Sequence, residues 1–357
     1  MYSDSTRATP FQSWAWLYSW WESYGEAYEL RLVTVRDGGL LVGLVPLMLE
    51  RRRGIGGRLL FIGTGITDYL DVLARDGWEA EITEPVVRAL KRMDRWQIAD
   101  LQQLRPEAAA WSIFESWDGP RARVRQDGFP MIDVKPWDEV LGALSRNLRS
   151  TARRTIKRAN KDGVRCELAT PAEAEQAARR FVALHREMWG GRDIRLEHLT
   201  ERFESFFVAA AERLTACGLG RISQFWLDEE VIASHFLLFG RDFVGEHLFG
   251  ARQEILRRYQ LSSLYLWDAV NVALSRDSDK VNLLQGEESY KLRWASEVIY
   301  NHRVTLLKNP NLNWLLVAYL SLVDLEQKAR RYVFAESTSP WIKKTVRWLK
   351  GRRMSVL

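Results

Sequence analysis

The stretch VNLLQGEESYKLRW, residues 281–294, joins an apolar strand to a turn rich in reactive groups. The apolar run Lys280–Leu284 predicts a buried strand, and Gly286 marks the turn that ends it. The groups that follow are two carboxylates, a phenol and an ammonium (Glu287, Glu288, Tyr290 and Lys291). Ligands of open α/β sheets bind beyond the carboxyl ends of the strands, so this stretch predicts both an α/β fold and a ligand site.

The residues that precede this stretch alternate between predicted helices and strands. We expect helices at Pro171–Trp189, Leu196–Ala216 and Ser262–Ser275, and strands at Gly220–Leu227, Glu230–Phe239 and Phe243–Gly250. The first two strands are joined at Asp228-Glu229. Because strands alternate with helices, the pattern indicates the α/β class with mixed sheets.

The first 135 residues give a similar order of elements. An aromatic helix at Gln12–Tyr24, with its tryptophans predicted in the core, precedes a hairpin that turns at Asp37-Gly38-Gly39. The strands of this hairpin are Glu29–Arg36 and Leu40–Leu49. Further strands are expected at Arg58–Gly63, Tyr69–Leu73, Trp96–Leu101, Arg121–Arg125 and Phe129–Val134, and helices near Glu79–Met93 and Glu107–Ser116. This order predicts two similar α/β halves, residues 1–135 and 136–308, followed by a basic helical tail at 309–357.

Composition restricts the class of protein. Of the 357 residues 46% are hydrophobic and 27% are charged, which permits a large core and excludes a disordered chain. The two cysteines, Cys166 and Cys217, form neither a disulfide framework nor metal-ligand spacing, so we expect no metal. No secretory signal is visible, and the longest apolar runs have about half of the ~20 residues that span a bilayer. We therefore expect a cytoplasmic protein.

Positive charge concentrates in the C-terminal tail. Residues 326–357 hold nine of the 52 lysines and arginines but two of the 46 acidic residues, so the rest of the chain is nearly neutral. The segment SPWIKKTVRWLKGRR places two tryptophans on one helical stripe among cations, which is typical of a helix at an anionic membrane surface. The alternative is a solvated terminal helix that packs Trp341 and Trp348 on the body.

A second basic segment lies at residues 146–165. Apolar residues recur every three or four positions from Leu148 to Ala159, and most other positions are basic, which predicts an amphipathic helix. Such a face can be merely solvated, but this much charge also favours a polyanionic ligand such as a phosphate, a nucleotide or a lipid head group. Arg149 and Arg153 are accordingly candidate substrate-binding residues.

The order Gly, acid, Tyr-Lys, two residues and Trp at residues 286–294 resembles the signature of bacterial GNAT-superfamily acetyltransferases of the CelD/BcsL type, associated with cellulose and exopolysaccharide biosynthesis. The resemblance covers about Arg146–Trp294. Its other parts are Arg158–Val164, Phe181–Trp189, Phe225–Phe239 and Gly250–Asp268. Pro10–Leu17 and Asp68–Asp71 are similar to the N-terminal half of that family.

This resemblance implies a tandem GNAT-like fold, shared with Fem-type transferases, and an acyl-CoA donor such as acetyl-CoA. The donor would lie along Phe243–Gly250, with its pyrophosphate on the loop Arg257–Ser263. The implied donor-binding residues are Phe249, Gly250, Arg257, Arg258, Gln260, Ser262 and Ser263. A helix N-terminus binds anions on physical grounds. The loop departs from the superfamily, however, because serines stand where glycine is preferred.

Acyl transfer requires a base, donors to the oxyanion and an acid for the leaving thiolate. Glu287 or Glu288 is the candidate base, Tyr290 the candidate acid and Lys291 a candidate substrate-binding residue. Backbone amides near Phe249–Ala251 are candidate oxyanion donors. The alternatives are a surface turn for the glutamates, and a packed phenol beside a salt-bridging lysine for the other two residues.

Two histidines compete for the role of base. His235 lies in the middle of a strand on the sheet that should line the site, so it joins the catalytic candidates. His185 lies beside an apolar helical stripe, which favours a core histidine. Because neither cysteine has a histidine nearby in the sequence, nucleophilic catalysis by a thiol has little support.

Together these features predict an enzyme, an acyl-CoA-dependent N- or O-acyltransferase. Its acceptor would be a small molecule or saccharide, namely a cell-envelope or exopolysaccharide precursor, met at the inner face of the membrane. One alternative is a Fem-type transferase that takes aminoacyl-tRNA, and another is a catalytically silent GNAT-like scaffold in a polysaccharide-synthesis complex. No long helical-hairpin insertion is visible between Pro171 and Ala216, so we do not expect a nucleic-acid partner.

Overall fold

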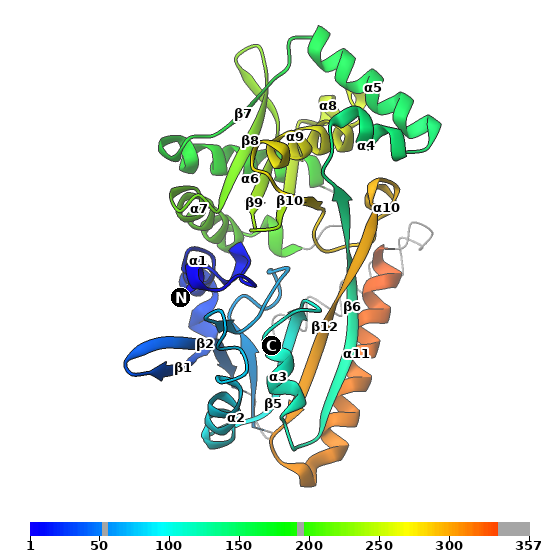
Figure 1. The fold of residues 1–357 in the computed structure, drawn as a ribbon. Helices are drawn as coiled ribbons and strands as arrows, with labels where there is room; N and C mark the ends of the chain where they lie inside the picture. The colour runs from blue at the N-terminus through cyan, green and yellow to red at the C-terminus, as the bar shows by residue number, and fades with distance from the viewer. Residues whose placement is uncertain (52–55, 191–195, 335–357) are drawn as a thin grey trace.

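The computed structural model describes residues 1–51, 56–190 and 196–334. The strands of these residues form one mixed sheet in the order β1-β2-β3-β5-β12-β6-β11-β10-β9-β8-β7, with β4 paired to β2. Helices pack on the sheet in two groups, one for each half of the molecule (Figure 1). The mixed α/β class is confirmed. The predicted membrane-surface segment around Trp341 and Trp348 lies outside the described residues.

The N-terminal half is built on five strands and three helices in the described chain. They are β1 (Glu29–Asp37), β2 (Leu40–Glu50), β3 (Gly57–Phe61), β4 (Leu73–Ala74), β5 (Trp96–Leu104), α1 (Trp14–Tyr24), α2 (Thr83–Arg92) and α3 (Ala110–Glu115). The hairpin turns where expected, because Gly38 and Gly39 adopt φ angles of 50° and 89°. The strand expected at Tyr69–Leu73 is largely loop, since only Leu73–Ala74 pairs with β2.

The C-terminal half follows the expected order more closely. Its elements are α4 (Trp137–Ala143), α5 (Arg146–Lys161), β7 (Arg165–Leu168), α6 (Ala174–Trp189), α7 (Glu201–Ala216), β8 (Gly220–Leu227), β9 (Glu230–Phe239), β10 (Phe243–Ala251), α8 (Gln253–Arg258), α9 (Leu261–Ser275), β11 (Lys280–Asn282) and α10 (Ser289–Trp294). The apolar side of α5 is buried as predicted, and it packs against α9. The short elements α4, β7, α8 and α10 have no clear sequence pattern.

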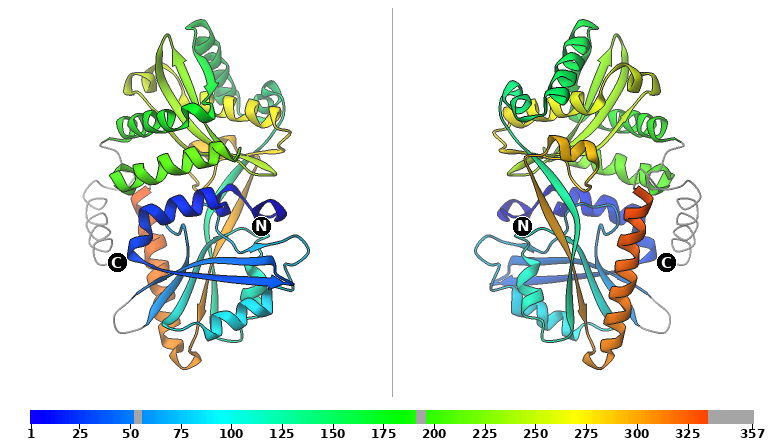
Figure 2. Two further views of the ribbon diagram at one scale, coloured as in Figure 1. Left: turned by 90° about the vertical axis from the view of Figure 1, so that its left-hand side faces the viewer. Right: turned by 90° about the vertical axis from the view of Figure 1, so that its right-hand side faces the viewer.

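Two long strands connect the halves. β6 (Arg121–Asp133), which we expected as two strands, is continuous and pairs with β11 through Met131–Asp133. β12 (Glu297–Leu307), which the sequence pattern did not reveal, pairs with both β6 and β5. Strands from each side of the expected boundary at residue 135 therefore complete the sheet of the other half. The chain then continues into α11 (Asn313–Phe334), which packs beside β12 (Figure 2).

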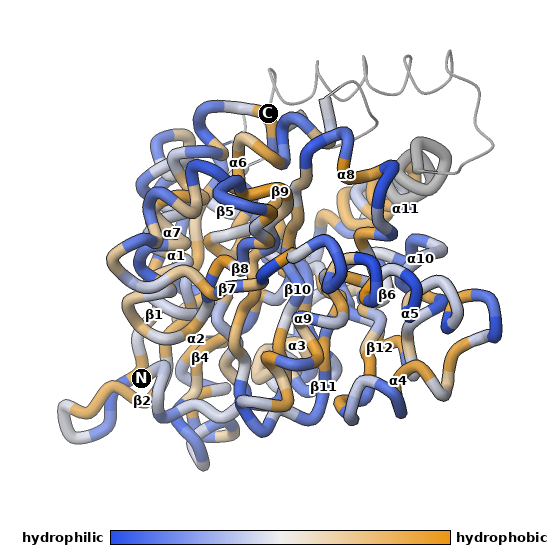
Figure 3. Tube along the Cα trace, turned by 90° about the horizontal axis from the view of Figure 1, so that it is seen from above, coloured by the Kyte–Doolittle hydropathy of each residue, from blue (hydrophilic) through white to orange (hydrophobic). Residues whose placement is uncertain are grey.

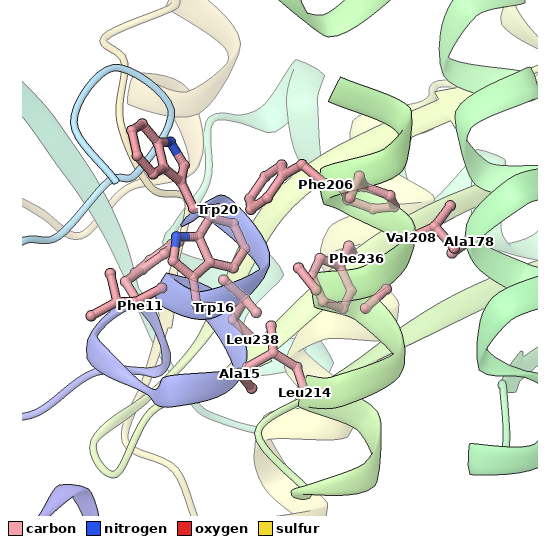
Figure 4. Close-up of a cluster of buried hydrophobic side chains, with 14 of the residues drawn as sticks. Phe11, Ala15, Trp16, Trp20, Ala178, Phe206, Val208, Leu214, Phe236 and Leu238 are labelled. Atoms are coloured by element: carbon pink, nitrogen blue, oxygen red, sulfur yellow. The ribbon is translucent and has the colours of Figure 1, made fainter. Parts of the chain in front are cut away.

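The largest aromatic cluster lies where α1 meets α7, at the junction of the halves (Figure 4). Trp16 meets Phe206 edge to face, with 5.0 Å between ring centroids. Such pairs add about 0.5–1.5 kcal/mol beyond the burial of their area, so this cluster holds the halves together. The prediction of a buried aromatic helix is wrong for Trp14, which is 65% exposed and stacks on Tyr18, because it lies on the outer face of α1.

Candidate functional site

The sheet opens beside β10. β10 pairs in parallel with β11 only through Phe243–Gly245. On its other edge it remains paired with β9 as far as Ala251, with a bulge between Glu246 and Leu248. Bulges redirect side chains and are frequent beside active sites. We expected the donor to lie along the whole of β10. The second half of this strand borders the opening between β10 and β11.

Glu246 lies where the two strands part. Only 4% of its surface is exposed. Its Oε1 is 3.8 Å from Nδ1 of His235 and accepts no hydrogen bond from the residues that the structure describes. A buried polar atom without a hydrogen-bond partner is costly and rare, so it marks a candidate functional group. Glu246 was not among the sequence candidates, because a single acid within a strand carries no motif.

His235 lies between two carboxylates. It is fully buried, its Nε2 is 2.8 Å from Oδ2 of Asp268 on α9, and its Nδ1 faces Glu246. Burial by itself would lower the pKa of His235, but the two carboxylates raise it to about 9. The imidazole is therefore protonated at neutral pH. This geometry disfavours His235 as a base and favours a positioning role beside Glu246.

Asp268 is a second residue that sequence reasoning missed. Burial would raise its pKa, but the hydrogen bond and charge of His235 lower it, with smaller contributions from Ser223 and Cys166. The Cys166 sulfur lies 3.2 Å from the Ser223 hydroxyl, and burial raises the pKa of the thiol. Cys166 is thus a neutral thiol in a hydrogen-bonded cluster, which agrees with the expectation that it is no nucleophile.

Two tyrosines lie beside the opening. The Tyr265 ring stacks on His235 with 5.0 Å between centroids, and its hydroxyl donates to the carbonyl of Gly250 at 3.0 Å. Tyr290 approaches Phe249 edge to face at 6.4 Å. Burial, followed by the charge of Glu246, raises the pKa of both phenols well above the usual range. The candidate acid Tyr290 therefore lies near Glu246 and keeps its proton.

The two glutamates of the motif do not point the same way. The Tyr300 hydroxyl donates to Oε1 of Glu287 at 3.1 Å. Glu288 is exposed and lies 3.4 Å from Nζ of Lys291, which also donates to the carbonyl of Gln285 at 2.8 Å. These contacts tie the loop between β11 and α10 to itself and to β12. They fit a surface turn and a salt-bridging lysine better than a catalytic base and a substrate ligand.

The expected donor loop is shorter than the sequence indicated. α8 and α9 are separated by two residues, because α8 includes Arg257 and Arg258 and α9 already begins at Leu261. Ser263 is fully buried, and its hydroxyl donates to Oε1 of Gln260 at 2.6 Å. Ser262 is half-buried and Arg257 is exposed. Of the two serines, Ser262 is therefore the one that an anion at the start of α9 can reach.

The basic helix α5 ends against this loop. Asp162, which follows α5, accepts a hydrogen bond from the Tyr259 hydroxyl at 2.6 Å and pairs with the Arg258 guanidinium at 2.7 Å. Arg158 lies over the Tyr259 ring, 5.9 Å from its centroid. The helix α5, whose trace is largely hydrophilic in Figure 3, thus contacts the expected donor loop through Arg158 and the Asp162 that follows it. The structure brings these two basic features together, and Arg258 is held by Asp162.

The two arginines proposed for substrate binding have different surroundings. Arg149 is half-buried and donates to the carbonyls of Gly142 and Leu144 at 2.8 and 2.9 Å, so it caps the end of α4. Arg153 is exposed and 3.2 Å from Asp138. The first contact indicates a structural arginine, whereas the second is a surface ion pair that a ligand can displace.

Two carbonyls of the expected donor strand are already occupied. Nδ1 of His185 donates to the carbonyl of Phe249 at 2.7 Å, and Tyr265 occupies that of Gly250. Burial lowers the pKa of His185 to about 4, so this imidazole is neutral and behaves as the predicted core histidine. A side chain at position 250 would meet the backbone of α6 at 2.4 Å, which explains the glycine. A donor along β10 must use the remaining backbone groups.

The N-terminal half also reaches the opening. Nδ1 of His247 on β10 is 3.2 Å from Oδ2 of Asp68, and the amide of Asn282 on β11 donates to the Tyr69 hydroxyl at 2.6 Å. All four residues are buried or nearly so. The Asp68–Asp71 stretch therefore contacts both of the strands that diverge.

Three further observations delimit the site. A groove of about 700 Å³ lies between α6 and the β8–β9 turn, and it shares no lining residue with the cluster around Glu246.

No group of three metal-ligating side chains occurs in the part of the chain that the structure describes. Over the same residues, no helix is both long and apolar enough to cross a membrane.

Comparison with known families gives one match to part of the chain. Residues 146–292 match the acetyltransferase (GNAT) domain family. The matched region contains β10, β11 and the buried residues around Glu246. Residues 146–292 are therefore similar to a GNAT-type acetyltransferase domain, and at that level the comparison supports the predicted enzyme class, an acyltransferase. No curated protein matches the chain in sequence.

Solved structures resemble the whole chain rather than this domain alone. The structure of FemX has a TM-score of 0.60 at 11% identity, over 83% of this chain and 92% of that one. The C-terminal domain of a putative lysylphosphatidylglycerol synthetase from Agrobacterium fabrum gives 0.54 at 11%, over 90% and 94%. L-PGS from Bacillus licheniformis gives 0.53 at 14%, over 85% and 95%. At these identities the likeness concerns the fold alone.

Proposed function

We propose that this protein is an acyl-CoA-dependent N- or O-acyltransferase whose acceptor is a cell-envelope or exopolysaccharide precursor. The observation that carries the proposal is the buried, partly unpaired carboxylate of Glu246 at the point where β10 leaves β11. Its support is chemical, because acyl transfer needs a base beside the acceptor and a proton beside the leaving group. The saccharide acceptor and the CelD/BcsL relationship come from the sequence resemblance.

The proposed reaction assigns one step to each group. Oε1 of Glu246 accepts the proton of the acceptor amine or hydroxyl as that atom forms its bond to the thioester carbonyl carbon. Backbone amides of β10 stabilise the oxyanion. The carbon–sulfur bond then breaks, and the Tyr290 hydroxyl gives its proton to the thiolate. His235, protonated between Glu246 and Asp268, positions the base through its charge.

Ligand-induced stabilisation tests the donor. A ligand that binds only the native state raises the unfolding midpoint by mass action. We expect millimolar acetyl-CoA or a longer acyl-CoA to raise the Tm, and the size of the shift to rank the acyl chains. No shift with any acyl-CoA or with free CoA would contradict the proposal.

A second candidate takes aminoacyl-tRNA in place of acyl-CoA. The observation that favours it is the exposed basic face of α5, which adjoins the loop before α9 through Asp162. FemX and the lysylphosphatidylglycerol synthetases, whose folds this chain shares, are the relatives that suggest it. Salt-sensitive binding of tRNA without an acyl-CoA shift would support this candidate, because phosphate contacts weaken steeply with salt. Binding of neither donor would favour the silent scaffold.

We propose that the protein acts at the inner face of the membrane. The support is the sequence of residues 326–357, in which nine cations accompany Trp341 and Trp348. Deleting Trp341–Leu357 should weaken association with anionic vesicles and leave the Tm nearly unchanged. A deletion variant that binds such vesicles as well as the full chain would remove the support of the tail.

A further inference from the structure

α11 has two apolar faces, although a surface helix normally has one. Its inner face packs on β5 and β12, where Leu315, Leu316, Tyr319 and Val323 form a buried cluster with Ile98 and Leu307. Its outer face carries four large apolar side chains, with exposed fractions of 62% for Trp314, 66% for Val317, 46% for Leu322 and 57% for Leu325. We call these four residues the outer stripe.

The outer stripe is continuous. Its members lie three, five and three residues apart, and the small exposed residues Ala318 and Ser321 lie between them, while exposed Asp324 lies at the edge of the stripe near the angular position of Val317. The sequence from Asn309 to Val323 contains no charged residue. Contiguous apolar surface of this kind marks an interaction site.

The outer stripe cannot insert as a membrane span, because the inner face of α11 is fixed to the sheet. A helix held in this way can only lie flat against an apolar boundary. In Figure 2, α11 runs along the outside of the molecule, beside the long strands. Interfacial helices have this geometry, with the apolar side in the boundary between head groups and acyl chains.

We propose that the outer stripe of α11 docks on the surface of an anionic lipid bilayer. Charge complementarity selects this occupant, because residues 326–357, which begin within α11, hold nine cations and two acids. An anionic bilayer offers an apolar layer to the stripe and negative head groups to these cations. A second copy of the chain would instead bring a segment with the same excess of cations, which offers no opposite charge. The proposal does not depend on which acyl donor the enzyme uses.

Flotation of the full chain with vesicles of phosphatidylcholine containing phosphatidylglycerol tests the proposal. The variant Val317→Glu/Leu325→Glu should reduce the lipid–water partition coefficient by about tenfold or more, since it places charge where apolar contact forms. Leu30→Glu/Leu32→Glu is the matched control, because these β1 leucines are also exposed, at 45% and 50%. The control should bind as the unmodified chain does. Equal Tm values would show that both variants fold.

Three results would overturn the proposal. One is undiminished flotation of the α11 variant, which would mean that something other than lipid covers the stripe. Another is a dimer in analytical ultracentrifugation that the α11 variant dissociates while vesicle binding is unchanged, which would identify a second copy as the occupant. Loss of binding in both the α11 variant and the β1 control would also count against it, because the effect would then follow from added negative charge alone.

Discussion

Each half of the molecule buries an ionic network beside a pair of parallel strands, and the two networks differ in how completely they are paired. In the N-terminal half, Asp100 on β5 accepts two hydrogen bonds from Arg303, at 2.6 and 2.7 Å, and one from Tyr319 at 2.6 Å. In the C-terminal half, Glu246 and His235 keep buried atoms without a hydrogen-bond partner among the described residues. Full pairing indicates a structural network, whereas incomplete pairing leaves capacity for a ligand.

The surroundings of each network support this difference. β3 pairs with β5 through Gly57–Leu59, so the N-terminal half has its own short parallel pair. There Arg58 pairs with Glu50 at 3.0 Å and lies 3.5 Å from Asp100, and Tyr319 of α11 completes the group. In the C-terminal half the corresponding strands separate at Glu246. We infer that protein side chains fill, in the N-terminal half, the kind of opening that the C-terminal half keeps beside Glu246.

The largest expected effect comes from Glu246→Gln, which keeps the shape of the side chain and removes its basicity. Acyl transfer, measured as thiol release from the acyl-CoA that gives the largest Tm shift, should fall by about 10²–10⁴-fold. Stability should change little, because the substitution removes a buried charge. Glu287→Gln and Glu288→Gln test the assignment made from the sequence. If either of these loses more activity than Glu246→Gln, the comparison of the two networks does not identify the base.

The fully paired network should respond in the opposite way. Arg303→Met leaves Asp100 buried with fewer partners, so the free energy of unfolding should fall by about 3–5 kcal/mol. The affinity for the donor should be unchanged in the folded variant. Urea unfolding measures the first quantity and donor titration the second. A loss below about 1 kcal/mol would show that the network is not structural.

Elements that depend on local sequence signals could be predicted, whereas those that depend on distant partners could not. Strand alternation and turn residues revealed β8, β9 and their turn at Asp228-Glu229, because these signals are local. β12 was missed, although it joins the halves, because its partners β5 and β6 lie far away in the sequence. The motif at 286–294 pointed to the region beside β10 and to Tyr290, whose role stays a prediction. It could not point to Glu246, whose proposed role depends on where two strands separate in space.

The two networks should also lose their contributions to stability at opposite ends of the pH scale. The pKa of His235 is raised to about 9 in the folded chain. Its contribution to the free energy of unfolding is therefore fully present below pH 6.5, or about the pKa of an unfolded histidine, and is lost as the pH rises through 9. The pKa of Asp100 is lowered to about 2, because Arg303, Arg58 and Tyr319 outweigh its burial, so its contribution is lost only as the pH falls through 2. Between pH 6.5 and 9.5 we expect unfolding free energy to decline by roughly 1–3 kcal/mol. Urea unfolding of His235→Gln should show a flatter profile over this range, and an equally steep one would contradict the assignment.

The smallest expected effect concerns the donor loop, where the opening of the C-terminal half meets the basic end of α5. Ser262 is half-buried in the first turn of α9, so Ser262→Glu places a negative charge at a helix N-terminus that would hold the donor pyrophosphate. Donor affinity should fall roughly five- to thirtyfold, because charge at a helix end is worth up to about 2 kcal/mol. Ser262→Ala is the matched control and should retain most of the affinity. Ser263 is unsuitable for this test, because it is fully buried and bonded to Gln260, so an acid there would disturb packing whether or not a donor binds. Equal donor affinity in Ser262→Glu and Ser262→Ala would mean that the phosphates lie elsewhere, and the exposed cations of α5 would then be the next place to look.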